Sequence, residues 1–122
     1  MPTDIVFIVA RILMGGPFLV AGIRNFRNLD RLVGLMSSRK VPQARIVTMI
    51  GVAVQTLSGL LIVLGILTPW AALGEAAFLA AATLIVHPFW TYPKDEQFPH
   101  INACIVNTAL VGSFLMLFAI SI

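Results

Sequence analysis

Charged side chains are scarce in this chain of 122 residues, because only 11% of them are Asp, Glu, Lys or Arg. Soluble domains average about a quarter, and 59% hydrophobic residues exceed what one water-excluding core of this size holds. Cysteine is scarcer still, and the single Cys104 excludes an internal disulfide and a Cys-x-x-Cys dithiol. A Gly-rich phosphate loop and a nucleophile elbow are also missing. These absences exclude most soluble enzyme classes and indicate a membrane protein.

Four long apolar stretches make up most of the sequence. Each is close to the ~20 residues that a helix needs to cross ~30 Å of hydrocarbon. We therefore predict an all-α fold, a polytopic membrane protein built as a four-transmembrane-helix bundle, with residues 1–122 forming one domain. The predicted crossings are residues 5–23, 46–67, 70–86 and 101–122.

Residues 28–37, between the first and second crossings, carry the pattern of an amphipathic helix. Leu29, Leu32 and Met36 share one helical face, while Arg31 lies on the opposite face. We predict a short helix that lies in the membrane interface. Anchoring of the loop to lipid explains this helix more simply than a binding site for a specific partner.

Basic residues are concentrated in one connection, where residues 24–45 hold most of the eight Lys and Arg side chains. Basic loops stay on the cytoplasmic side of a bacterial inner membrane, so we predict that connections 24–45 and 88–100 are cytoplasmic and that both termini lie outside. Residues 1–4 include no basic residue, so we expect the first apolar stretch to remain as a helix and not to be removed as a signal peptide. Orientation and anionic lipid explain these charges without a nucleic acid as partner.

Arg11 and Glu75 are the only charged residues inside the four apolar stretches. A charge at such depth is rare unless it has a partner or a task. Counted from the outer ends of their stretches at 1.5 Å per residue, both residues lie ~8 to 9 Å below the membrane boundary. We therefore predict an ion pair between Arg11 and Glu75, which either serves assembly of the bundle or lines a ligand pocket.

A second set of polar residues falls near the opposite, inner ends of the helices. Arg24 ends the first crossing, His87 ends the third, and His100 and Asn107 open the fourth. Histidine and asparagine can hydrogen-bond a quinone carbonyl, and His87 could also transfer a proton. The alternative is that these side chains satisfy backbone groups at the helix ends. The candidate pocket residues are Arg11, Gln55, Glu75, His87, Trp90 and Asn107.

Metal and haem chemistry are weakly supported by the sequence. His100 and Cys104 lie four residues apart on one helical face, but a zinc site needs better-spaced ligands. Bis-histidine haem would have to use His87 and His100, which lie near the same surface. We predict no metal and no bound cofactor, and a quinone is the one cofactor that the polar residues could serve.

Four short segments of the chain form a pattern known from one membrane-protein family. Arg11 is followed by FLVAGI at 18–23, and the later segments are GLLIVLGILT at 59–68, HPFW at 87–90 and NTALVG at 107–112. Over almost the whole chain, this pattern resembles the DoxX family of small four-helix bacterial and archaeal membrane proteins. The positions that match the family pattern are Arg11, Gly22, Gly59, Gly65, His87, Trp90 and Asn107.

The chain departs from the DoxX pattern at three places. Gln55 stands where the family usually has a glutamate, Arg24-Asn25 where a lysine often follows the first helix, and Pro69 where an arginine often follows the second helix. We hypothesise that Glu75, on the third crossing, replaces the missing acid as the counter-charge of the buried arginine.

The resemblance to the DoxX family implies a function in company with other proteins. Some relatives are subunits of a thiosulfate:quinone oxidoreductase or of membrane complexes that handle thiol and oxidative stress. We therefore expect a small membrane subunit, accessory to an oxidoreductase, whose partners are lipid, redox proteins and further copies of the chain. A rival class is a small proton-coupled solute or drug transporter that acts as a dimer, although such transporters usually carry their acid on the first helix. A third class is a purely structural membrane subunit.

Overall fold

The computed structural model describes residues 4–122, and within that range the chain forms helices and no strand. The long helices, together with the two short 3₁₀ turns between the last two of them, are α1 (Ile5–Arg27), α2 (Leu29–Ser38), α3 (Ala44–Leu64), α4 (Thr68–Val86), η1 (Phe89–Thr91), η2 (Lys94–Glu96) and α5 (Gln97–Ser121). Helices α1, α3, α4 and α5 belong to four segments that are long and apolar enough to cross a membrane. The predicted all-α fold with four crossings is therefore confirmed.

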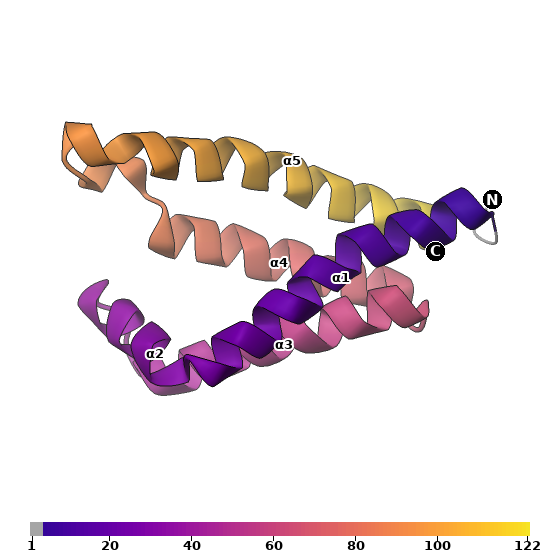
Figure 1. The fold of residues 1–122 in the computed structure, drawn as a ribbon, viewed down its shortest axis with the longest axis horizontal. Coiled ribbons are helices and arrows are strands. Elements are labelled where there is room, and N and C mark those ends of the chain that lie inside the picture. The colour runs from indigo at the N-terminus through magenta and orange to yellow at the C-terminus, as the bar shows by residue number, and fades with distance from the viewer. Residues whose placement is uncertain (1–3) are drawn as a thin grey trace.

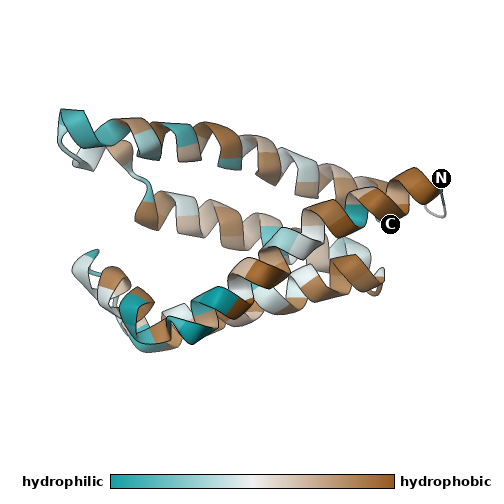
Figure 2. Ribbon diagram, in the orientation of Figure 1, coloured by the Kyte–Doolittle hydropathy of each residue, from teal (hydrophilic) through white to brown (hydrophobic). Residues whose placement is uncertain are grey.

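The helices pack in sequence order around two interior helices. Helix α1 lies across α3, α3 packs on α4, and α5 covers the other side of α4 (Figure 1). At one end of the molecule, here called the turn end, residues 65–67 lie beside the start of α1 and the end of α5. The other end, here called the basic end, contains residues 24–45 and 87–100. Hydrophilic residues gather at the basic end, whereas the helices between the ends are mostly hydrophobic (Figure 2).

Glycines bring α1 and α3 into backbone contact. A Cβ atom on Gly59 would lie 2.7 Å from the backbone nitrogen of Leu19 and 2.8 Å from the carbonyl oxygen of Gly15. These distances are shorter than real Cβ contacts, so only glycine fits this crossing without displacing a helix. Small residues allow close backbone approach in the same way throughout membrane bundles.

The tight turn between α3 and α4 is built on Gly65. Gly65 has a φ of 73°, the left-handed conformation that glycine adopts without a steric penalty. The amide of Ile66 donates to the carbonyl of Leu61 at 3.0 Å, which is the long bond of a Schellman motif. Pro69 follows in the first turn of α4, where its missing amide hydrogen leaves no bond unmade. This local chemistry makes α3 and α4 an antiparallel hairpin.

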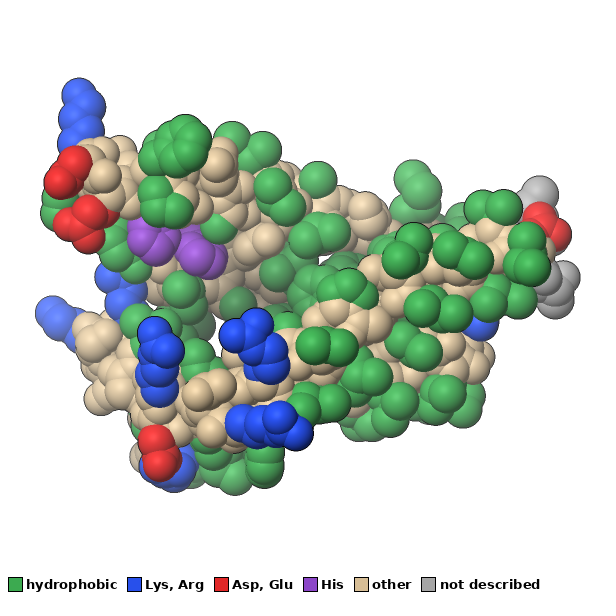
Figure 3. All heavy atoms as spheres, viewed as in Figure 1, with side chains coloured by type: hydrophobic (Ala, Val, Ile, Leu, Met, Phe, Trp, Pro, Cys, Tyr) green, Lys and Arg blue, Asp and Glu red, His purple; other side chains and the backbone are tan. Residues whose placement is uncertain are grey.

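The small core of the bundle lies between α3, α4 and α5. Phe18 and Phe114 meet edge to face, with ring centroids 5.2 Å apart. Many large apolar side chains face outward, and they are spread over the visible face of the helices (Figure 3). Lipid-facing helices have this character, because hydrocarbon and not water surrounds them. The buried core residues are Ile62, Ala71, Ala72, Ala76, Leu79, Phe114 and Leu117.

The predicted interfacial helix is confirmed as α2, which folds back beside the start of α3. Leu29, Leu32 and Met36 are half-buried, and Asp30 on the other face is exposed. The carboxylate of Asp30 accepts a hydrogen bond from the Arg45 guanidinium at 2.8 Å. Because both partners are exposed, this ion pair contributes little stability, but it ties α2 to α3.

Candidate functional site

Glu75 lies inside the bundle with no exposed surface. It belongs to the buried stripe of α4, between Ala72 and Leu79. Both of its carboxylate oxygens lack a hydrogen-bond partner among the residues that the structure describes. Buried polar groups are normally satisfied, and an unpaired charge inside a membrane is costly. A carboxyl group in this state destabilises the folded protein and is therefore a candidate for a functional role.

Arg11 lies at the turn end, against the end of α3. A Cβ atom on Gly65 would overlap the Arg11 guanidinium, whose Cζ atom would be 2.7 Å away. The Arg11 guanidinium also lies 5.7 Å from the ring centroid of Phe7. Its Nε atom is buried and has no hydrogen-bond partner within residues 4–122. The positive charge therefore sits beside the negative end of the α3 dipole, which favours it electrostatically.

The predicted ion pair between Arg11 and Glu75 is absent from the described part of the chain. A Cβ atom on Gly74 would lie 2.6 Å from the hydroxyl oxygen of Ser58, so Glu75 is level with the middle of α3. The Arg11 guanidinium is level with Gly65, which lies seven residues after Ser58 on α3. Seven residues correspond to ~10 Å along a helix. The depth count was wrong because α1 begins well beyond the turn between α3 and α4. In this structure Glu75 is therefore not the counter-charge of Arg11.

Gln55, predicted as a pocket residue, forms a hydrogen bond between two helices. The side-chain nitrogen of Asn25 donates to the side-chain oxygen of Gln55 at 2.9 Å, and this bond joins α1 to α3. Only 4% of Gln55 is exposed, so the bond satisfies a polar group that would otherwise be buried alone. Both residues stand at positions where the chain departs from the DoxX pattern. An amide pair therefore connects the two helices where the family usually supplies an acid and a basic residue.

The two histidines meet at the basic end. The Nδ1 atoms of His87 and His100 are 2.8 Å apart, so one ring must donate and the other must accept. The ring of His100 also stacks on Tyr92, with centroids 3.8 Å apart. The Arg39 guanidinium lies over the ring of Tyr92, 4.9 Å from its centroid. Its Nε donates to the carbonyl of Ile85 at 3.0 Å. These contacts close the ends of α4 and α5 and attach the α2–α3 connection to them.

The remaining predicted site residues, Asn107 and Trp90, do not contact the two histidines through a hydrogen bond or ring contact of the described chain. Asn107 donates to the hydroxyl of Thr83 at 2.9 Å and thereby joins α5 to α4. Trp90 is 62% exposed and packs edge to face on Phe89. The six candidate pocket residues are consequently distributed from the turn end to the basic end and do not form one pocket.

An apolar groove that sequence reasoning missed opens between α2, α3 and α4 near the basic end. Its volume is about 400 Å³. Most of its lining is aliphatic, and the ring of Phe78 and the polar side chains of Asn25 and Thr48 also line it. The sequence signal for this groove is a set of small residues on α3 and α4, which leave space between the two helices. The small residues are Gly51, Ala77, Ala81 and Ala82.

Four apolar crossings, an interfacial helix and a basic end together define a small polytopic α-helical membrane protein. Residues 6–88 match the model of the DoxX family, which is more than half of the chain. The chain therefore belongs to the DoxX family.

One curated relative extends this similarity beyond the matched region. The chain is 26% identical over 113 residues to the inner membrane protein YphA of Escherichia coli (strain K12). The alignment covers 93% of this chain and 81% of that protein. No solved structure matches the chain.

Proposed function

We propose that this DoxX-family chain is an accessory subunit of the inner membrane, which holds a quinone for partner redox proteins. The observation that carries the proposal is the apolar groove between α2, α3 and α4, whose lining includes the Asn25 side-chain amide. Its volume of about 400 Å³ lies within the range of pockets that hold small organic ligands. The name of the relative YphA supports placement in an inner membrane. The concentration of Lys and Arg at the basic end favours an orientation with that end toward the cytoplasm.

Asn25 supplies the polar contact that a quinone needs. An amide nitrogen carries two hydrogens, and the Asn25 nitrogen gives one of them to Gln55. The second hydrogen can bond a quinone carbonyl while the ring packs against Phe78 and the isoprenoid tail follows the aliphatic wall. Reduction to the quinol consumes two electrons and two protons. In this proposal a partner redox protein supplies the electrons, and the aqueous phase at the basic end supplies the protons.

Filling the groove tests the proposal. Ala81 lines the groove, whereas its neighbour Ala80 is exposed elsewhere on α4, so Ala81→Phe and Ala80→Phe form a matched pair. We expect Ala81→Phe to weaken binding of a short-chain ubiquinone by about tenfold or more, because the added ring occupies the site. Affinity is measured by equilibrium titration of the detergent-solubilised protein, and an azidoquinone should label α2, α3 or α4. Equal affinities for both variants, or no quinone binding by the unmodified protein, would overturn the proposal.

Glu75 favours a second candidate function, which is proton-coupled transport. A carboxyl group that is fully buried, with no hydrogen-bond partner among residues 4–122, can bind a proton in one conformation and release it in another that opens toward water. Proton-coupled carriers use membrane acids in this way, and their binding sites lie near the middle of the membrane. Quinone binding does not require Glu75, so the two candidate functions depend on different residues and can be separated by mutation.

A further inference from the structure

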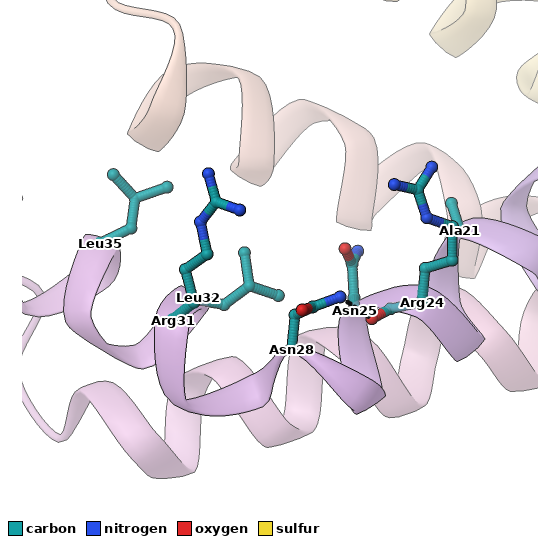
Figure 4. A pocket seen from close by; sticks show the side chains of 7 residues that line it. All are labelled: Ala21, Arg24, Asn25, Asn28, Arg31, Leu32 and Leu35. Atoms are coloured by element: carbon teal, nitrogen blue, oxygen red, sulfur yellow. Dashed lines mark hydrogen bonds between the residues drawn. The ribbon is translucent and has the colours of Figure 1, made fainter.

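A second hollow lies at the corner where α1 ends and α2 begins (Figure 4). Its volume is about 440 Å³, and residues of both helices line it. The side chains of Arg24, Arg31 and Leu35 project toward the same side of this corner. We propose that the corner, here called the arginine corner, binds the phosphate of an anionic phospholipid. The lining residues are Ala21, Arg24, Asn25, Asn28, Arg31, Leu32 and Leu35.

The charge of the arginine corner is positive and uncompensated. Neither the Arg24 nor the Arg31 guanidinium forms a hydrogen bond or an ion pair with any residue from 4 to 122. The nearby carboxylate of Asp30 is paired with Arg45 and does not line the hollow. Basic side chains are gathered over this part of the molecule in the space-filling view (Figure 3). Each of these two unpaired guanidinium groups carries a positive charge and a planar set of donors, which suits phosphate oxygens.

Local hydrogen bonds preorganise the polar wall of the corner. The Asn28 side chain donates to the carbonyl of Arg24 at 2.8 Å, which braces the junction between α1 and α2. Asn25 is held by Gln55 across the helix interface. Hydrogen bonds therefore hold the two asparagine side chains of the hollow in place, whereas the two arginine side chains can adjust to a ligand. A ligand bound there would pay less ordering entropy than one on a flexible loop.

The apolar part of the corner favours a lipid over free phosphate. Leu32 and Leu35 line the hollow together with the two arginines. Asn25 and Leu32 also line the apolar groove, so the two spaces adjoin. A phospholipid headgroup at the arginines could therefore pack the start of an acyl chain against Leu32 and Leu35, outside the apolar groove. The corner also lies at the end of the α1 crossing, the depth at which anionic headgroups attract basic side chains.

The test compares two pairs of charge removals at the basic end. Arg24→Gln/Arg31→Gln removes the two charges of the corner, and Arg27→Gln/Lys40→Gln removes two charges from the same end that do not line it. Native mass spectrometry of the full chain in detergent measures retention of added phosphatidylglycerol against phosphatidylcholine. We expect the corner variant to lose the preference for phosphatidylglycerol by about tenfold, while the control keeps most of it, because only the former loses charge-assisted bonds.

Other outcomes separate the alternatives. Equal loss in both variants would mean a diffuse basic surface and would overturn the proposal. Displacement of phosphatidylglycerol by millimolar inorganic phosphate would identify a free-anion site and would also overturn it. If the double variant does not fold, the single Arg31→Gln, on the exposed face of α2, and the charge-preserving Arg24→Lys/Arg31→Lys serve instead. The lipid measurement does not use the quinone or Ala81, so this inference and the proposed function fail separately.

Discussion

At the scale of single residues, Glu75 is the most unusual feature of the molecule. It is an acid with no exposed surface and no partner among the described side chains. Arg11, the other charge within a crossing, occupies a different level and contacts the end of α3 through Gly65. Opposite charge and an equal residue count from the helix ends predicted a pair, but the offset between α1 and α4 separates the two groups. The neutral hydrogen bond between Asn25 and Gln55 connects α1 to α3.

Replacing Glu75 should separate its structural role from a functional one. We expect Glu75→Leu to keep or raise the melting temperature in detergent, because an unsatisfied buried polar group costs about 1–3 kcal/mol. Glu75→Gln should fold as the unmodified protein does, but should abolish any proton flux in dye-loaded liposomes under an imposed potential. Marked destabilisation of Glu75→Leu would contradict this reasoning and would mean that the carboxyl group has a partner in the membrane. Unchanged proton flux in Glu75→Gln would exclude the transport candidate.

At the scale of helices, the contact between α1 and α3 depends on glycine. A side chain at Gly59 would collide with the backbone of α1 at Leu19 and Gly15, whereas a Cβ atom on Gly16 meets nothing within 4 Å. Helix α1 therefore presents one glycine to α3 and another to an open side. Gly15 and Gly16 are adjacent in sequence, but only Gly15 packs against α3. Sequence alone showed a pair of adjacent glycines in the first crossing without showing which one is constrained.

Alanine substitutions at these two levels test the helix contact. We expect Gly59→Ala to destabilise the protein by about 1–3 kcal/mol, because the helices must separate to admit the methyl group. Gly16→Ala should be neutral or stabilising by about 0.5–1 kcal/mol, because alanine is the better residue inside a helix. Reversible unfolding in mixed micelles measures both effects. Similar stabilities for the two variants would show that α1 and α3 are less closely packed than the structure indicates.

At the scale of the whole molecule, charge and helix number predict one orientation. The basic end contains α2 and the connection between α4 and α5, and the turn end contains residues 65–67. Lys40 and Leu67 are exposed at these opposite ends, and both have left-handed backbone conformations. They are therefore matched sites for a labelled cysteine.

Labelling from one side of the membrane checks the orientation. In a Cys104→Ser background, we expect Leu67→Cys to react with an impermeant maleimide in intact spheroplasts. Lys40→Cys should react only after lysis, because positive loops remain on the cytoplasmic side. The reverse pattern would invert the predicted topology and would place the arginine corner at the outer face.

Sequence patterns predicted the elements better than the site. The four crossings and the interfacial helix follow from local hydropathy and period, and the structure confirms both. The apolar groove was missed because small residues such as Ala81 have the same pattern whether a neighbour fills the space or leaves it open. Trp90 was proposed for a pocket on the basis of the family pattern, and the structure exposes it. The contact between His87 and His100 could not be predicted from the sequence, because it depends on the conformation of the connection between α4 and α5.

The sequence by itself determined the solvent of this protein, its number of crossings and the location of its basic end. These properties are local, because transfer free energy and helix length depend on composition over about 20 residues. Only the tertiary structure decided which polar groups meet. The close contact of Gly15 with Gly59 and of Gly74 with Ser58 sets the offsets between helices. Those offsets place Arg11 and Glu75 at different depths, join Asn25 to Gln55, and leave a groove beside them.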